Sequence, residues 1–369
     1  MKHVDHFHGS DLEKIEQIYH IKKEDITSFS ANVNPLGISF QLRESLASHI
    51  DAITSYPDRE YTSLRKSIAQ YTGTDYENIL VGNGSSELIS ILIKIRNPKK
   101  ALILGPTYSE YEREVTITGG RCHYFPLKEE DNFKLNLDSL FEALQADVDL
   151  LIICNPNNPT SSQLTVQEIR KILDVCKQKD IFVMVDETYV EFVEDIAAIT
   201  AIPLTEYYNN IIILRGISKF FAAPGLRLGY AICGNRDLIK EINQKKNPWT
   251  INSLAAIAGE IMFSDSDYIA QTRALISSER SRICEKLSTC KDLRIYPCHA
   301  NFLLVRILHP EITADDIFDA AIRKNLMIRN CSTFPFLDNK YFRFCFMSPA
   351  KNDELLNVIL SQFSVANQK

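Results

Sequence analysis

The sequence has 369 residues, of which 45% are hydrophobic and 24% are charged, a composition typical of a globular protein. Because this length exceeds the usual size of a single hydrophobic core, a large domain and a smaller domain are expected. The net charge of −6 excludes a general attraction to nucleic acid or to an anionic membrane, so an anionic ligand needs a local group of cations.

The N-terminal residues, MKHVDHFHGSDLEKIEQ, lack the apolar core of a signal peptide. The nine cysteines are scattered and none forms a CxxC pair, so reduced thiols are expected rather than a disulfide framework. His3, His6 and His8 lie close together, but no cysteine or carboxylate pattern accompanies them, so no metal site is expected. These features favour a cytoplasmic protein.

The middle of the chain alternates short apolar segments with amphipathic helical segments, the pattern of a mainly parallel sheet covered on both faces. Between two of these segments, 165–179 is expected to be a helix, because its apolar positions share one face. Thr165 and Glu168 have the spacing of a capping box at its start. Five strands are expected: Ala101–Leu104, Leu150–Cys154, Ile181–Val185, Ile211–Leu214 and Leu228–Cys233.

After about residue 240 the pattern changes to that of a smaller α+β domain. Helices are expected near 268–289, 313–324 and 353–363, around the strand-like segments LRIYP, NFLLVRI, LMIR and YFRFCF. The N-terminal forty residues look irregular and are expected to pack on this domain. The expected division is an N-terminal segment at 1–40, a large domain at 41–265 and a small domain at 266–369.

A glycine-rich turn in VGNGSSELISILIKI precedes an amphipathic helix. Free N–H groups at Ser85 and Ser86, together with the helix dipole, suit a phosphate. The segment is not a Walker A loop, because it lacks the GxxxxGK[ST] pattern. It is not a dinucleotide-binding motif either, because Glu87 replaces the third glycine. Taken alone, such a turn is more often structural than functional.

Two ionisable residues follow apolar strands, where ligands of open α/β sheets bind. Asp186 ends the apolar segment IFVMV, so a buried carboxylate there needs a cationic or hydrogen-bonding partner, although a helix N-cap or turn is the simpler interpretation. Lys219 lies in a loop after the strand NIIIL. Loop lysines are usually solvated, but a lysine flanked by apolar residues can lose its proton and become a Schiff-base nucleophile.

Five motifs occur in order along the chain: GNGSSE, PTYSEY, NPNNPT, DETY and SKFFAAPGLRLGY. Together they resemble the fold-type I enzymes of the aspartate-aminotransferase superfamily, which use pyridoxal 5′-phosphate (PLP). The resemblance runs from about Phe29 to the C-terminus. It implies an α/β fold with a large PLP-binding domain, whose mainly parallel sheet is covered by helices, and a smaller α+β C-terminal domain.

The resemblance implies three catalytic residues. Lys219 is expected to hold the cofactor as a Schiff base and to move protons, and Asp186 to pair with the pyridine nitrogen so that the ring accepts electrons. Tyr189, with Asn158, is expected to donate hydrogen bonds to the 3′-oxygen of the ring.

Other cofactor contacts are implied in the same way. Tyr108 is expected to stack on the ring, and Tyr56 matches a tyrosine that reaches the cofactor of a neighbouring subunit, so a homodimer with shared active sites is expected. One departure is Ser161, where glycine is commoner; a turn with positive φ would be mildly strained there, without touching the chemistry. The residues expected to hold the cofactor phosphate are Ser85, Ser86, Ser218 and Arg227.

Within the superfamily the chain most resembles threonine-phosphate decarboxylase and histidinol-phosphate aminotransferase. The segments FHGSD, FSANVNPLG, NPWTINSLAAIAG and IRNCSTFPFLD favour the decarboxylase, whereas Ser10 departs from its HGG motif. By resemblance, Arg329 and Arg343 bind the anionic ends of the substrate; surface arginines in salt bridges are the alternative interpretation. The further candidate substrate contacts are His8, Asn34 and Asn158.

These features predict a PLP-dependent carboxy-lyase of the cobalamin-biosynthesis type, converting L-threonine O-3-phosphate to (R)-1-aminopropan-2-yl phosphate. L-serine O-phosphate is a variant substrate to consider, because one methyl group changes binding by only about 1–3 kcal/mol. The alternative is transamination of histidinol phosphate with 2-oxoglutarate, for which the sequence provides the same groups. A non-catalytic PLP-binding regulator is disfavoured by the presence of Lys219, Asp186 and Arg227 together. Neither nucleic acid nor membrane is an expected partner.

Overall fold

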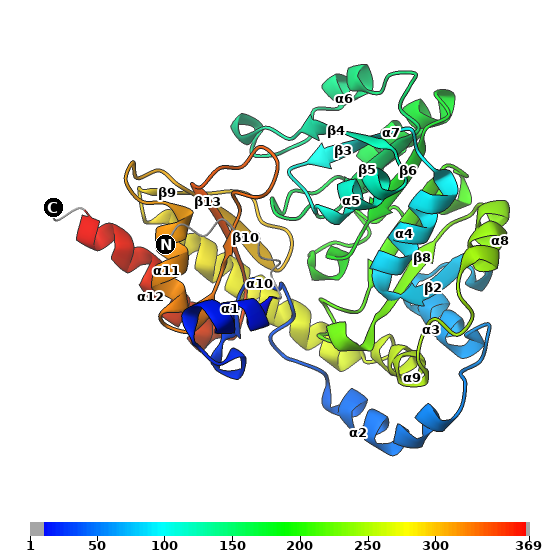
Figure 1. Ribbon diagram of the computed structural model, residues 1–369, viewed down its shortest axis with the longest axis horizontal. Helices are drawn as coiled ribbons and strands as arrows, with labels where there is room; N and C mark the ends of the chain where they lie inside the picture. The colour runs from blue at the N-terminus through cyan, green and yellow to red at the C-terminus, as the bar shows by residue number, and fades with distance from the viewer. Residues whose placement is uncertain (1–10, 367–369) are drawn as a thin grey trace.

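The computed structural model describes residues 11–366, which contain a seven-stranded sheet and a separate four-stranded antiparallel sheet (Figure 1). The large sheet has the strand order β2-β8-β7-β6-β5-β3-β4. Strand β8 is antiparallel to the other strands, which all run parallel to one another, so the expected mainly parallel sheet is confirmed. Its strands are β2 (Ile79–Asn83), β3 (Lys100–Gly105), β4 (Arg121–Pro126), β5 (Leu150–Cys154), β6 (Phe182–Asp186), β7 (Ile211–Gly216) and β8 (Leu228–Ile232).

All five strands expected from the sequence form, with ends that shift by at most two residues. The sequence analysis did not predict β2 or β4. Strand β4 is an edge strand whose residues are all half-exposed or exposed, so RCHYFP lacks the continuous apolar run of a buried strand. Strand β2 is short and ends in the glycine-rich turn that was assigned to a loop.

Helices cover both faces of the large sheet because alternate strand residues point to opposite faces. On one face, strand residues such as Ile103 and Met184 pack with α4 (Gly84–Arg96), α5 (Glu110–Ile117) and α8 (Arg236–Lys245). On the other face, residues such as Ile153 and Val183 pack with α3 (Thr62–Thr72), α7 (Val166–Gln178) and α9 (Ser253–Met262). The capping box of Thr165 and Glu168 is present at the start of α7.

The smaller sheet has the order β12-β13-β10-β9. Helix α10 begins beside α9 and extends along this sheet (Figure 1). The three helices expected here form, although the third begins four residues earlier than expected, at Pro349. The elements of this region are α10 (Ser266–Ser288), β9 (Leu293–Ile295), β10 (Phe302–Ile307), α11 (Ala314–Ile322), β11 (Leu326–Met327), β12 (Arg329–Asn330), β13 (Tyr341–Cys345) and α12 (Pro349–Ala366).

The N-terminal region is more regular than expected, because α1 (Leu12–Tyr19) is a helix that buries Ile15 completely. The Tyr19 hydroxyl donates a hydrogen bond of 2.9 Å to Asp319 in α11, and β1 (Thr27–Ser28) pairs with β11. The segment therefore lies against the smaller sheet region. Two further helices are α2 (Phe40–Ser48) and α6 (Leu137–Ala143). Within residues 11–366, no helix combines the length and apolar character needed to cross a membrane.

Candidate active site

Lys219 lies in the connection between β7 and β8, at the carboxyl end of β7. Its side chain is only partly exposed, and Nζ donates a hydrogen bond of 2.7 Å to the backbone oxygen of Ala31. Burial, followed by the positive charges of Arg343 and Arg227, lowers the pKa of Lys219 to about 8. A much larger fraction of this amine is therefore neutral and nucleophilic near pH 8 than in a solvated lysine.

Asp186 is the last residue of β6 and is 4% exposed. Its Oδ1 accepts hydrogen bonds from the backbone N–H and the hydroxyl of Thr188, at 2.9 and 2.5 Å. These bonds form the turn that was the simpler interpretation of Asp186, but they engage only Oδ1 of its carboxylate. Burial raises the pKa of Asp186, and no lysine or arginine of the described chain lies within ion-pair distance of it. The carboxylate therefore lacks the cation that its ionised form needs.

Tyr111 is a site residue that the sequence analysis missed. Its buried hydroxyl donates a hydrogen bond of 2.7 Å to Asp186 Oδ2. The ring of Tyr108 lies edge-on to it, with 5.6 Å between the ring centroids. Burial, together with the charges of Glu110 and Asp186, raises the pKa of Tyr108 to about 12. Tyr108 precedes α5 and Tyr111 lies in its first turn, so the available signal was only that both tyrosines belong to the motif PTYSEY.

An anion cradle forms where α4 begins. Gly84 has φ +74°, which strains any residue with a Cβ atom, and a Cβ there would lie 2.4 Å from Arg227 Nη2, so the guanidinium lies close over this glycine. Arg227 is exposed, and its side chain donates hydrogen bonds within the described chain to the backbone oxygens of Pro224 and Asn83, each at 3.5 Å. No carboxylate among residues 11–366 pairs with Arg227. An unpaired guanidinium at a helix N-terminus is a favourable place for a phosphate.

Two of the predicted phosphate contacts, Ser85 and Ser86, lie in the first turn of α4 beside this cradle. A Cβ added to Gly216, at the end of β7, would lie 3.8 Å from Ser85 Oγ, so the end of β7 approaches the same turn. Ser218 follows in the loop that carries Lys219. The structure thus brings the predicted phosphate contacts and the reactive lysine to one edge of the sheet.

Arg343 lies on β13 and is 4% exposed. It donates hydrogen bonds to Asn158 Oδ1 and, at 2.6 Å, to the backbone oxygen of Ser30, whereas its buried Nε has no partner in the described chain. Arg343 is therefore not a surface arginine in a salt bridge. The interaction also joins the smaller sheet to the loop that follows β5.

Arg329 lies opposite Arg343 in the register of β12 and β13. It donates a hydrogen bond of 2.9 Å to the hydroxyl of Thr333. Burial lowers the pKa of Arg329 to about 10, and the nearby positive charge of Arg343 acts in the same direction. Two guanidinium groups thus lie on neighbouring strands of the smaller sheet, in an arrangement that an anionic ligand would stabilise.

Tyr189 is 5% exposed, and its ring lies edge-on to Phe302, with 4.9 Å between centroids. Its hydroxyl oxygen accepts a hydrogen bond of 3.2 Å from Asn32 Nδ2, so Asn32 is a second residue that the sequence analysis missed. Asn34, a predicted substrate contact, lies next to Lys219, because its backbone N–H donates a hydrogen bond of 2.9 Å to the Lys219 backbone oxygen. Its side-chain Nδ2 donates to the Phe220 backbone oxygen at 2.7 Å and to side chains of α10.

Tyr56 does not join this group within one chain. It is 80% exposed, and its ring packs against Trp249, with 4.8 Å between centroids. His8 lies outside the described residues.

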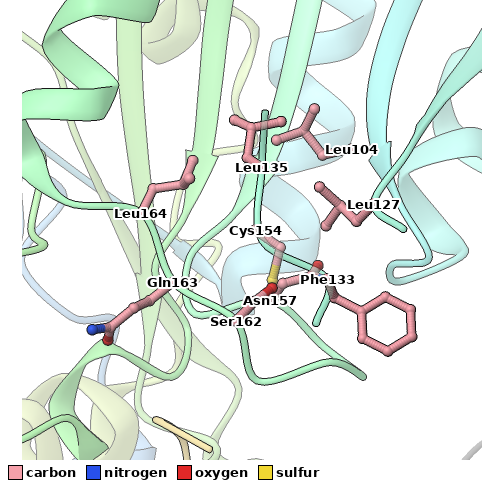
Figure 2. Close-up of a pocket in the computed structure, with 9 residues that line it drawn as sticks. All are labelled: Leu104, Leu127, Phe133, Leu135, Cys154, Asn157, Ser162, Gln163 and Leu164. Atoms are coloured by element: carbon pink, nitrogen blue, oxygen red, sulfur yellow. The ribbon is translucent and has the colours of Figure 1, made fainter. Parts of the chain in front are cut away.

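Figure 2 shows a separate pocket beside the loop that follows β5. None of the predicted site residues lines it, and it has no charged side chain, so it does not suit a phosphorylated ligand. Its lining consists of Leu104, Leu127, Phe133, Leu135, Cys154, Asn157, Ser162, Gln163 and Leu164.

Comparison with known proteins gives consistent matches over nearly the whole chain. A family model described as aminotransferase class I and II matches residues 24–359. The threonine-phosphate decarboxylase of Salmonella typhimurium is 32% identical over 349 residues, which cover 95% of this chain and 94% of that protein. The histidinol-phosphate aminotransferase of Ruminiclostridium cellulolyticum is 32% identical over 330 residues, which cover 88% and 87%. The crystal structure of the histidinol-phosphate aminotransferase from Clostridium acetobutylicum has a TM-score of 0.84 and 32% identity, covering 89% of this chain and 97% of that one.

Proposed function

The chain belongs to the class I and II aminotransferase family, and from this premise we propose that it decarboxylates L-threonine O-3-phosphate to (R)-1-aminopropan-2-yl phosphate. The chain is an enzyme that depends on pyridoxal 5′-phosphate. The proposal concerns the substrate and the bond that breaks. It is supported by the similarity to a threonine-phosphate decarboxylase along 95% of this chain.

The described side chains fit this cofactor. The buried carboxylate of Asp186 accepts three hydrogen bonds, from Tyr111 and twice from Thr188, but pairs with no cation of the described chain, which suits a protonated ring nitrogen. The N-terminus of α4 and the unpaired Arg227 suit the cofactor phosphate, together with Ser85, Ser86 and Ser218. We assign the covalent attachment to Lys219. The remaining contacts proposed here are Tyr108 on the ring face, Asn158 and Tyr189 at the 3′-oxygen, and Tyr56 from a neighbouring subunit.

The observation that carries the substrate class is the pair Arg329 and Arg343. A substrate with a phosphate and a carboxylate needs more than one cation in a protein whose net charge is −6. Arg343 is buried with a free Nε, and Arg329 lies opposite it on the neighbouring strand. We propose that these two guanidinium groups bind the two anionic ends of the substrate.

When bound, the cofactor would supply an electron sink for the negative charge left on Cα of the substrate. For decarboxylation, Arg329 and Arg343 would orient the substrate so that the bond from Cα to the carboxylate is the one that breaks, and CO₂ would leave. Lys219 then delivers a proton to Cα. An amine with a pKa near 8 can both hold and release a proton near neutral pH, as this step requires.

The alternative function is transamination of histidinol phosphate with 2-oxoglutarate. It is favoured by the 32% identity to histidinol-phosphate aminotransferases in both sequence and solved structure. The same residues would serve, with the substrate oriented so that Lys219 would remove the proton from Cα.

The purified enzyme should be incubated separately with threonine phosphate, serine phosphate and histidinol phosphate, each with and without 2-oxoglutarate. We expect CO₂ release from threonine phosphate without a keto acid. Serine phosphate should react more slowly if the methyl group of the substrate contributes to binding. Glutamate formation from histidinol phosphate and 2-oxoglutarate, without CO₂ release from either phosphoamino acid, would refute the decarboxylase assignment.

We further propose a cytoplasmic homodimer. All nine cysteines are free, which favours a reducing compartment. Exposed apolar side chains gather along the segment that contains α2 and include Phe40 at 78% and Ile53 at 64% exposure. The exposed Tyr56 follows directly after them, so a second subunit that covers this surface would also receive the tyrosine.

A further inference from the structure

Ser161 has an unfavourable backbone conformation in the core of the protein. Its φ is +59°, and its side chain is completely buried. Glycine adopts this region freely, whereas a residue with a Cβ atom does so at a cost. A serine at such a position therefore needs a compensating interaction made by its hydroxyl group.

The Ser161 hydroxyl makes three hydrogen bonds to one turn, residues 298–301. Its oxygen accepts the backbone N–H groups of His299 and Ala300, at 2.9 and 2.8 Å, and its proton is directed to Cys298 Sγ at 3.7 Å. Ser161 belongs to the loop after β5, in the large sheet region, whereas the turn leads into β10 of the smaller sheet. The hydroxyl therefore fixes one sheet region against the other.

The other side of the same turn is held by Arg280 of α10. Its Nη2 donates to the backbone oxygens of His299 and Ala300, at 3.1 and 3.2 Å. Because Ser161 binds the N–H groups and Arg280 the carbonyl groups, the turn has little freedom to shift. The residue that follows, Asn301, is completely buried.

Asn301 links this turn to the site. Its Nδ2 donates a hydrogen bond of 3.0 Å to the backbone oxygen of Asn32, and Asn32 Nδ2 donates one of 3.2 Å to the Tyr189 hydroxyl. Because the Tyr189 hydroxyl oxygen accepts this bond from Asn32, the hydroxyl proton can be donated to another acceptor. The position of the turn thus influences the direction of that proton.

We propose that Ser161 is a positioning residue for Tyr189, acting through the 298–301 turn, Asn301 and Asn32. The inference rests on the proposed function only in taking Tyr189 as a donor to the 3′-oxygen of the cofactor. A donor there stabilises the deprotonated form of the cofactor linkage. The protonated and deprotonated forms of this linkage differ in absorbance. Loss of the Ser161 hydroxyl should therefore raise the pH at which the two forms of the bound cofactor are equally populated.

The test compares Ser161→Gly, Ser161→Ala and the matched control Ser162→Ala. Both Ser161 variants remove the hydroxyl, but the glycine variant also relieves the backbone conformation and should fold readily. Ser162 has the same side chain one residue later, lines the pocket of Figure 2, and hydrogen-bonds Thr160 rather than the turn. Hydrogen exchange of the His299 and Ala300 amides is measured with and without cofactor, and the absorbance midpoint is measured on the holoenzyme.

In both Ser161 variants the amides of His299 and Ala300 should exchange about tenfold faster than in the native enzyme, because each amide loses one hydrogen bond. The absorbance midpoint should rise by roughly half a pH unit. Ser162→Ala should change neither quantity. Unchanged exchange, or faster exchange with the midpoint of the native enzyme, would overturn the proposal. Neither measurement uses a substrate, so failure of the decarboxylase assignment would be seen separately.

Discussion

Two buried ionisable groups set the chemistry of the site at the scale of single residues. Lys219 is shifted toward its neutral form by burial and by two nearby arginines. Asp186 is buried with hydrogen-bond donors on both oxygens but without a cation. The first group suits attack on an aldehyde, and the second suits pairing with a cationic ring.

The pKa of Lys219 predicts how covalent cofactor attachment depends on pH. As pH rises through about 8, the amine loses its proton and becomes nucleophilic, so attachment should accelerate and then level off. Mixing cofactor-free enzyme with pyridoxal 5′-phosphate at several pH values, followed by absorbance, measures this rate. Lys219→Ala should show no covalent attachment at any pH. A rate that keeps rising to the pKa of a solvated lysine, about 10.4, would contradict the assignment.

The hydrogen bond from Tyr111 to Asp186 predicts the effect of Tyr111→Phe. A buried carboxylate oxygen loses its donor, so stability should fall by about 1–3 kcal/mol, cofactor affinity should weaken and kcat should fall. Urea unfolding, cofactor titration and turnover measure these effects. Tyr19→Phe is the matched control, because Tyr19 donates a similar bond to Asp319 far from the site. It should lower stability alone; an equal loss of cofactor affinity in both variants would contradict a specific role for Tyr111.

At the scale of elements, a buried ion pair joins the carboxyl ends of β6 and β7. Strand β6 ends at Asp186, and β7 leads into the loop that carries Lys219. Arg215 donates to Glu187 Oε2 from Nε and Nη2, at 2.9 and 2.7 Å, and both residues are almost completely buried. Glu187 also accepts from Thr200 and from the backbone N–H of Ala201. This network holds the carboxyl ends of the two strands in a fixed relation.

Arg215→Met should therefore destabilise the protein by about 3–5 kcal/mol, because it leaves the carboxylate of Glu187 buried without its cation. Chemical denaturation measures the loss. Arg113→Met breaks an exposed pair with Glu110 on α5 and should cost less than about 1 kcal/mol. Equal losses in the two variants would show that the buried pair has no special structural role.

At the scale of the whole molecule, the site depends on contacts between its two sheets. Arg343 reaches from β13 to Asn158, and the Ser161 hydroxyl binds the turn before β10. A third contact is Glu129, after β4, which accepts hydrogen bonds from Tyr296 at 2.7 Å and Arg294 at 3.1 Å. These contacts hold the smaller sheet, which carries Arg329 and Arg343, against the larger sheet, which carries the residues proposed to hold the cofactor.

The exposed apolar surface around α2 predicts the effect of Phe40→Asp. If the proposed dimer forms through this surface, a charge at Phe40 should weaken association, so light scattering should show a larger monomer fraction at low concentration. Tyr207→Asp, at a residue that is 66% exposed elsewhere on the large sheet region, should leave the mass unchanged. A native protein that is monomeric, or a Phe40→Asp variant with unchanged mass, would argue against an interface there.

The sequence by itself determined the elements whose residues carry a local signal. The buried strands β3, β5, β6, β7 and β8 have continuous apolar runs, and the capping box marks the start of α7. The order of the motifs was enough to predict the family, and the ends of the strands were enough to predict that Asp186 and Lys219 lie on one edge. The role expected of Arg227 came from the resemblance alone.

Only the tertiary structure decided which side chains meet. Tyr111 donates to Asp186, the hydroxyl of Ser161 binds the turn at 299–300, and Asn32 contacts Tyr189. Each pair joins residues far apart in the chain, on elements whose local pattern is satisfied whichever neighbour they meet. Periodicity reports which face of an element is buried, whereas a hydrogen bond depends on atomic positions within about 3 Å, which are fixed only when the sheets pack.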